Sequence, residues 1–327
     1  MKKIKFPELT DRNAWFLENR AVRIGIEKRT GWVRSVEFKR AGCDLFGIRK
    51  QDIPGYVGHL RVHDEYDEVT YSELTDRIRV VRASKRGNKV TVVKRFVGAP
   101  FELKVTFELD KRALTWTVEA TKANAKVADR SLRVGFNMPL HAGWKVWAPC
   151  HGGEFLFDGM DDFNFNHVQV SYVSPRDIIL PMVSHYSPSL DVGYSILEPI
   201  EAKVPAAKFQ FENGEKCFNW GYTQKHPHQV QSLECLNYYI GLAGDRTMRT
   251  EVKLLFHEGD WRPALGQVYR MYREYFDPDS PEIYESEGVY HCGGVDVGRD
   301  TDFYTDLELK CLEVHGHFSY YGDYFYE

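Results

Sequence analysis

The stretch that decides the fold class is Val22-Arg23-Ile24-Gly25-Ile26, followed by Thr30-Gly31 and a second run over residues 33–38. Apolar and polar side chains alternate in both runs, and the Thr30-Gly31 pair between them is typical of a turn. A period of two places alternate side chains on opposite faces of a strand. The stretch therefore predicts two neighbouring β-strands with one buried face.

The same strand pattern continues along the chain to about Phe256. Two hairpins are predicted, residues 77–82 with 90–96 across Arg86-Gly87-Asn88, and residues 102–109 with 114–120 across Asp110-Lys111-Arg112. Further strands are expected at residues 132–138, 192–197, 208–211 and 251–256. Many strands without helical segments between them indicate a sandwich or barrel, so residues 15–256 should be antiparallel and nearly free of helix.

The hydrophobic period changes near Asp260. Apolar residues then recur at helical spacing over residues 261–276, with Asp260 as N-cap and Pro263 in the first turn. Residues 277–281 read Asp-Pro-Asp-Ser-Pro and should end this helix. Residues 282–306 are Gly-rich, and residues 309–314 form a last apolar run.

Composition excludes several classes of protein. The chain has 327 residues, 43% of them hydrophobic, and a net charge of −4 with a pI near 6.3. Charges are mixed along it without a basic stripe, so no nucleic-acid partner is expected. No apolar run approaches the ~20 residues of a spanning helix, and residues 1–6 lack the apolar segment of a signal peptide. Six scattered cysteines without a C-x-x-C pair suit a reduced, cytoplasmic protein.

The opening of the chain resembles a known family. Residues 15–24, the turn at Thr30-Gly31 and the Gly42-Cys43-Asp44-Leu45 segment are similar to the start of a galactose-mutarotase-like supersandwich. Such domains commonly precede the catalytic domain of glycoside hydrolases. The helix with Tyr275-Phe276-Asp277-Pro278, the Gly-rich stretch and the apolar run resemble the junction in sandwich-plus-(β/α)8-barrel enzymes such as α-galactosidase-type hydrolases.

This resemblance implies a domain organisation. Residues 1–258 would form the sandwich, residues 259–281 a linker helix, and residues 282–327 the start of a truncated catalytic barrel, with residues 309–314 as its first strand. The barrel's remainder would be missing. The expected function is the N-terminal part of a glycoside hydrolase that acts on oligosaccharides through two carboxylates. Both would lie beyond this chain, which would then be inactive alone.

Barrel enzymes place their chemistry at the C-terminal ends of the strands. The sequence therefore predicts a sugar-binding site, and its candidate residues lie at or just past the end of the last apolar run: Glu313, His315, His317, Tyr320 and Tyr321. The alternative is that His315 and His317 are structural loop residues. No cofactor is expected.

Two other functions stay open. The sandwich could be a non-catalytic module that binds carbohydrate or supports the barrel. The His-x-His pair at residues 315–317 could instead hold a metal in a metal-dependent hydrolase, although a site needs three or four ligands. Catalysis by the sandwich itself, as in sugar mutarotases, would need a histidine and a carboxylate facing a sugar on one sheet. No stretch reproduces the His- and Asn-rich motifs of those enzymes, and the nearest candidates, His185-Tyr186 and Glu234, match them poorly.

Several local segments are interpreted as loops. The loop over residues 158–166 after Trp144-Lys145-Val146-Trp147 is rich in oxygen-bearing side chains and aromatic rings, but it does not match a calcium motif. Residues 63–68, a run of charges, are expected to form a solvated loop. His226-Pro227-His228 is interpreted in the same way.

Overall fold

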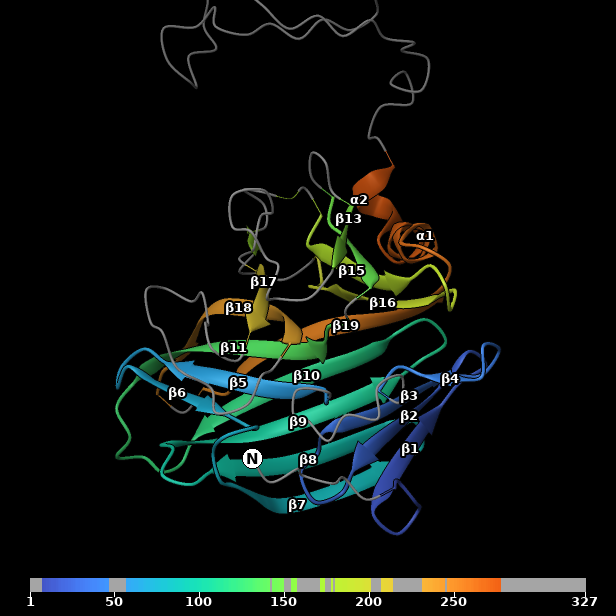
Figure 1. Ribbon diagram of the computed structural model, residues 1–327. Helices are drawn as coiled ribbons and strands as arrows, with labels where there is room; N and C mark the ends of the chain where they lie inside the picture. Colours follow the sequence, from blue (N-terminus) through green and yellow to red (C-terminus); the bar gives the residue numbers. More distant parts are fainter. Residues whose placement is uncertain are drawn as a thin grey trace, which may run out of the picture. The chain divides into compact units, whose positions relative to one another are not determined.

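The computed structural model describes residues 8–46, 57–141, 143–149, 154–157, 171–173, 178, 180–200, 207–213, 231–244 and 246–277. The chain divides into two compact units, Met1–Arg270 and Met271–Glu327. Nearly all the described residues belong to the first unit, which is built from three antiparallel sheets (Figure 1).

The largest sheet has nine strands in the order β13-β12-β15-β16-β19-β10-β9-β8-β7. In Figure 1 it runs from β7 at the bottom of the view up to β15 and β13. Its strands, in chain order, are β7 (Ile78–Arg86), β8 (Lys89–Phe96), β9 (Phe101–Leu109), β10 (Leu114–Lys122), β12 (Trp144–Trp147), β13 (Glu154–Phe157), β15 (Met182–Ser187), β16 (Val192–Leu197) and β19 (Met248–Glu258).

The second sheet has six strands in the order β14-β17-β18-β11-β5-β6. These strands are β5 (His59–Asp64), β6 (Val69–Ser72), β11 (Arg130–Pro139), β14 (Ser171–Val173), β17 (Ala207–Asn213) and β18 (Gln231–Leu242). The third sheet consists of β1 (Ala14–Glu18), β2 (Val22–Glu27), β3 (Val33–Phe38) and β4 (Cys43–Asp44). β1 contacts β8 and β9 of the large sheet.

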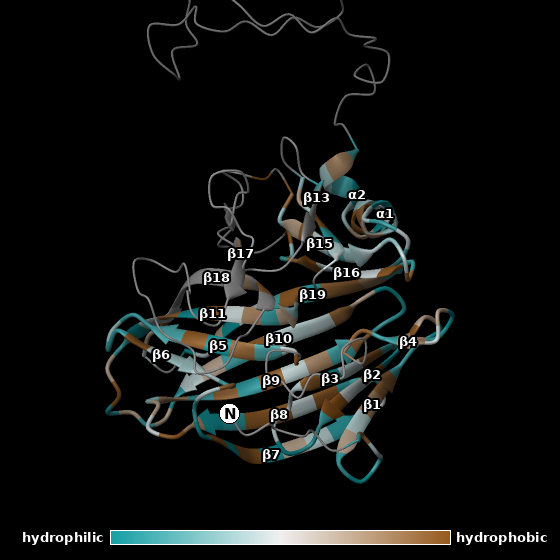
Figure 2. Ribbon diagram, viewed as in Figure 1, coloured by the Kyte–Doolittle hydropathy of each residue, from teal (hydrophilic) through white to brown (hydrophobic). Residues whose placement is uncertain are grey.

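One hydrophobic core joins the three sheets. Trp116 of β10 packs edge-on against Phe136 of β11, with ring centroids 5.3 Å apart, and Tyr71 of β6 packs against Phe101 of β9 at 5.4 Å. Leu17, Ile24 and Val36 of the small sheet are buried in the same cluster. The alternation of hydrophilic and hydrophobic positions along the strands is visible in Figure 2. The expected mainly β, antiparallel sandwich is therefore confirmed.

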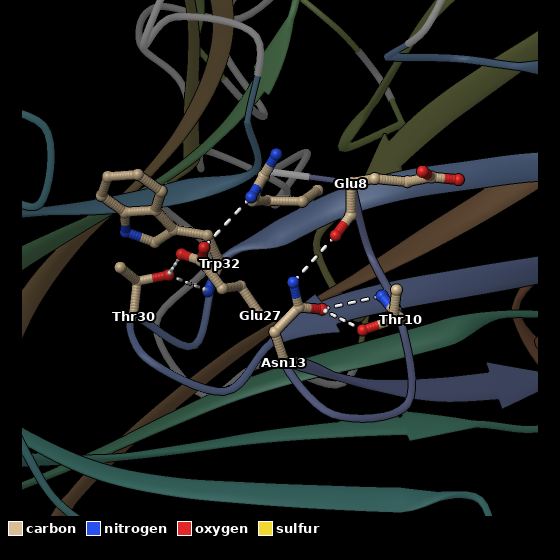
Figure 3. Close-up of polar contacts among 7 residues, drawn as sticks. Glu8, Thr10, Asn13, Glu27, Thr30 and Trp32 are labelled. Carbon is tan, nitrogen blue, oxygen red and sulfur yellow. Dashed lines mark hydrogen bonds and ion pairs between the residues drawn. The ribbon is translucent and has the colours of Figure 1, made fainter. Parts of the chain in front are cut away.

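The two predicted hairpins are both present, as β7–β8 and β9–β10. Gly87 in the first turn has φ +56°, a backbone conformation that glycine adopts without strain. The start of the small sheet is fixed by polar contacts around the β2–β3 turn, where the hydroxyl of Thr30 donates to the Glu27 carboxylate at 2.6 Å (Figure 3). Arg34 also donates to Glu27 at 3.0 Å.

The expected helix is present and has a break. α1 (Arg262–Met271) starts after Asp260, whose carboxylate accepts a hydrogen bond from the Arg262 N–H at 2.9 Å, as an N-cap does. Tyr272 has φ −129° and ψ 40°, outside the helical range, and separates α1 from α2 (Arg273–Phe276). No helix among the described residues is long and apolar enough to span a membrane. Residues 282–327, including the predicted barrel strand, lie outside the described residues.

Candidate functional site

A cluster of polar residues lies on β5 and β11, in the middle of the six-stranded sheet. The register pairs His59 with Asn137, Arg61 with Gly135, and His63 with Arg133. The intervening residues Leu60, Val62, Val134 and Phe136 belong to the hydrophobic core. Because successive side chains of a strand point to opposite faces, the polar residues lie on the face turned away from that core. We call His59, Arg61, His63, Arg133 and Asn137 the polar face.

Four of the five residues of the polar face are buried, and His63 is partly exposed. The exposed fractions are 2% for His59, 5% for Arg61, 7% for Arg133 and 0% for Asn137. Charged side chains on the outer face of an antiparallel sheet are normally solvated, and arginine is almost never fully buried unless it is paired. These side chains are therefore held inside the protein in a polar environment.

Hydrogen bonds fix the two imidazoles. His59 Nδ1 lies 2.9 Å from the carbonyl oxygen of Val57, which can only accept, so Nδ1 carries a proton. In the neutral ring Nε2 is then the acceptor nitrogen. His63 Nδ1 contacts the Thr70 hydroxyl at 2.8 Å, and its Nε2 is 3.6 Å from the Glu65 carboxylate.

Glu65 also forms an ion pair with Arg133. Burial lowers the pKa of His63 below its ordinary value, and the nearby Arg133 charge lowers it further, while Glu65 opposes both effects. His63 is therefore mostly uncharged at neutral pH and can both donate and accept hydrogen bonds.

Buried ion pairs hold β5 in place. Glu73, which follows β6, accepts the N–H of Leu60 at 2.8 Å and pairs with Lys94 of β8, and both side chains are at most 2% exposed. Asp64, at the end of β5, pairs with Arg130 of β11. Removing one partner of a buried ion pair leaves the other charge buried and unpaired, which is costly. These contacts therefore favour the observed position of β5 next to β6 and β11.

The register extends the row of polar residues across the sheet. Asn137 of β11 is paired with Glu234 of β18, Glu234 with Gln210 of β17, and Gln210 with Ser171 of β14. Positions 59, 137 and 234, far apart in the sequence, thus lie on three adjacent strands. His59 and Asn137 bring an imidazole and an amide to this row, and both groups supply the donors and acceptors that sugar hydroxyls require.

His185, the other histidine named for a mutarotase-like site, is a core residue. It is fully buried on β15, and its Nε2 accepts the N–H of His141 at 2.9 Å while Nδ1 lies 3.2 Å from the Lys145 carbonyl oxygen. Burial holds its pKa well below the usual range, so the ring is neutral. Trp144 and Tyr194 pack against it. Its role is structural.

The predicted sugar-site residues Glu313, His315, His317, Tyr320 and Tyr321 lie outside the described residues, as do the loop over residues 158–166 and the His226-Pro227-His228 segment. Trp144 to Trp147 form strand β12. Among the described residues no group of three or more His, Cys, Asp or Glu could hold a metal ion.

The expectation of a solvated loop at residues 63–68 is wrong at its start. His63 and Asp64 are the end of β5, and Asp64 is 0% exposed because it pairs with Arg130. The signal was present in the sequence, since residues 59–64 alternate His-Leu-Arg-Val-His-Asp. A strand whose outer residues are charged and buried resembles a charge run when read alone.

Comparisons with known proteins found no matching family model and no matching curated protein. The fold is similar to several solved structures. One is a galactose mutarotase-like protein from Lactobacillus casei, at 12% identity and TM-score 0.46, covering 75% of this chain and 100% of that one. Another is the aldose epimerase homologue from C. elegans, at 11% identity and TM-score 0.46, covering 76% and 100%.

A third is a GH36 α-galactosidase from Geobacillus stearothermophilus solved with stachyose, at 9% identity and TM-score 0.47. The match covers 92% of this chain and 49% of that one, so this chain spans about half of the α-galactosidase. These are the two kinds of protein that the opening segment and the junction resemble. At such identities the likeness concerns the fold, and the activity has to be argued from the residues.

Proposed function

We propose that this chain recognises a carbohydrate on the polar face of its six-stranded sheet. The observation that carries the proposal is the burial of His59, Arg61, Arg133 and Asn137 on the face turned away from the hydrophobic core. Burying such groups costs free energy unless they serve structure or function. These side chains are not part of the apolar core, whose contacts come from the alternate residues of the same strands.

The chemistry of the polar face suits a sugar. Sugar hydroxyls each donate and accept, so a site for them mixes both kinds of partner. Arginine supplies donors in a planar fork, the asparagine amide supplies both, and a neutral imidazole supplies one of each. A strongly anionic ligand is less well matched, because Glu65 already offsets the charge of Arg133.

The test is isothermal titration calorimetry with a panel of mono- and oligosaccharides, using the wild-type chain and Asn137→Ala. Loss of one or two hydrogen bonds to a bound sugar should weaken binding roughly 10-fold. Lys104→Ala, on the exposed outer face of the nine-stranded sheet, is the control and should bind normally. Sugar binding that both variants retain unchanged would place the site elsewhere.

Polarimetry on the same samples distinguishes binding from catalysis. His59 and Glu234 lie on either side of Asn137 in the register, and a proton donor and acceptor on one sheet could interconvert sugar anomers. Faster mutarotation with the wild-type chain than with Glu234→Gln would assign epimerase activity to the sandwich. Equal rates would leave it a binding module.

A second candidate function is the sandwich of a glycoside hydrolase. It is favoured by the sequence after α2, where five residues lie at or just past the end of the apolar run at residues 309–314: Glu313, His315, His317, Tyr320 and Tyr321. We propose these as a sugar subsite at the mouth of a barrel. In an active hydrolase His317→Ala should lower kcat/KM for aryl glycosides roughly 10- to 1000-fold without unfolding the protein. Activity that is lost to a chelator and restored by a divalent metal would favour the metal-dependent alternative.

A further inference from the structure

A cavity of about 260 Å³ lies within the first compact unit, and none of its lining residues comes from β5 or β11. Four structural elements form it: the β1–β2 turn, the β9–β10 turn, the end of β19 and the C-terminal half of α1. Its lining combines an apolar floor, two amide side chains and three cations: Asn19, Ala21, Val22, Leu109, Lys111, Arg112, Phe256, Gln267 and Arg270. No acidic residue is among them.

The three cations are unpaired. Lys111, Arg112 and Arg270 are exposed, and none forms an ion pair with any residue in the described part of the chain. The contrast with neighbouring strands is clear, because Lys89, Lys104 and Arg95 each pair with a glutamate at 2.6 to 2.8 Å. Three like charges around one cavity repel each other, and an anion in the cavity would relieve that repulsion.

Asn19 makes the cavity rigid. Its side-chain oxygen accepts the N–H groups of Ala21 and Val22, both at 2.9 Å, and its amide nitrogen donates to the Asp110 carbonyl oxygen at 2.9 Å. One side chain thus ties the β1–β2 turn to the β9–β10 turn. The Asp110 carboxylate accepts the N–H groups of Arg112 and Ala113, at 2.6 and 2.7 Å, so its charge is directed at its own turn.

Gln267 adds a neutral polar group on the helix side. Its Oε1 is buried, and no described group gives it a hydrogen bond. Arg270 lies one turn later on the same helix face, next to Gly266, where the missing side chain leaves room for the guanidinium. The cavity therefore offers charge-assisted donors together with an amide that can bind a hydroxyl group.

From this arrangement we propose that the cavity is a binding site for a phosphate group, carried by a small hydroxylated molecule such as a sugar phosphate or present as free phosphate. The cations neutralise the phosphate, Gln267 binds a hydroxyl, and Val22, Leu109 and Phe256 contact the apolar side of the ligand. The size agrees, because the cavity is smaller than the ~300–1,000 Å³ of sites for drug-sized ligands.

The experiment is calorimetry at low ionic strength with three probes: hexose 6-phosphate, inorganic phosphate and the unphosphorylated hexose. Binding of the hexose phosphate is expected, with none of the hexose at this cavity. Tighter binding of hexose phosphate than of inorganic phosphate would identify a phosphorylated metabolite as the ligand, and equal binding would identify the free anion; both support the site.

Two variants and one matched control decide the location. Arg112→Gln and Gln267→Glu, which places a negative charge in the cavity at nearly constant size, should each weaken phosphate binding about 10-fold or more. Arg82→Gln removes one exposed, unpaired cation from β7 and should leave the affinity unchanged. Failure of phosphate to bind, or equal weakening by Arg82→Gln, overturns the proposal. Circular dichroism confirms that each variant is folded, and this test does not depend on sugar binding at the polar face.

Discussion

At the scale of single residues, Glu198 is the clearest pH-sensitive group. It follows β16, is 3% exposed, and has no hydrogen bond or ion pair to its carboxylate among the described residues. Burial raises its pKa from 4.5 to about 7. The folded state therefore favours the protonated carboxyl, so its contribution to stability is complete below pH 4.5 and is lost as the pH rises through 7.

Glu198→Gln should remove this dependence. The raised pKa corresponds to a loss of about 3 kcal/mol in the free energy of unfolding between acidic and alkaline pH. Urea unfolding at pH 5 and pH 8 measures it, with the exposed Glu108→Gln as control. The wild type and Glu108→Gln should lose stability over this range, and Glu198→Gln should lose about 2.5 kcal/mol less, because pH 5 already lies above the ordinary pKa of 4.5. Parallel losses in all three proteins would show that the Glu198 carboxyl is solvated.

Individual elements show which parts of the fold could be predicted from the sequence alone. The hairpins β7–β8 and β9–β10 were predictable because their alternation and turns are local. β15 could not be recognised in the same way, because apolar and polar residues do not alternate in its sequence, Met-Val-Ser-His-Tyr-Ser. The polar face could not be predicted for a different reason. Positions 59, 137 and 234 are brought together by strand pairing, and a single sequence does not reveal which distant strands pair.

At the scale of elements, β7 is an exposed edge strand of the nine-stranded sheet. The expectation of evenly mixed charge is wrong here, since residues 77–95 contain eight Lys or Arg and no acidic residue. Lys89, Lys94 and Arg95 have acidic partners, whereas the β7 cations have none among the described residues. Charge on an edge strand prevents pairing with a second sheet.

Replacing these charges should expose the edge. In Arg82→Thr/Lys85→Thr, β7 keeps its strand propensity but loses its repulsion, so self-association is expected to increase with protein concentration. Light scattering after size-exclusion chromatography is the measurement. A double substitution at the paired Lys104 and Glu119, which leaves the net charge unchanged, serves as the comparison and should not change the mass. An unchanged mass for the β7 variant would mean that the edge is protected by something other than its charge.

At the scale of the whole molecule, the sandwich architecture separates the apolar core from the polar face, because the two use opposite faces of β5 and β11. One hydrophobic core spans the three sheets, and it takes only the inner residues of β5 and β11. The outer residues of these strands are polar, and buried ion pairs at Glu73 and Asp64 hold them in register. Fold and candidate site thus use alternate positions of the same strands.

A crystal structure of the chain with bound sugar would show whether the polar face is the binding site. We expect density for the sugar on the polar face, with ring or hydroxyl oxygens within hydrogen-bond distance of His59, Arg61 and Asn137. The sugar should be absent in Asn137→Ala crystals grown and soaked in the same way. A sugar bound at a different surface, with the polar face occupied only by the protein's own residues, would contradict the claim.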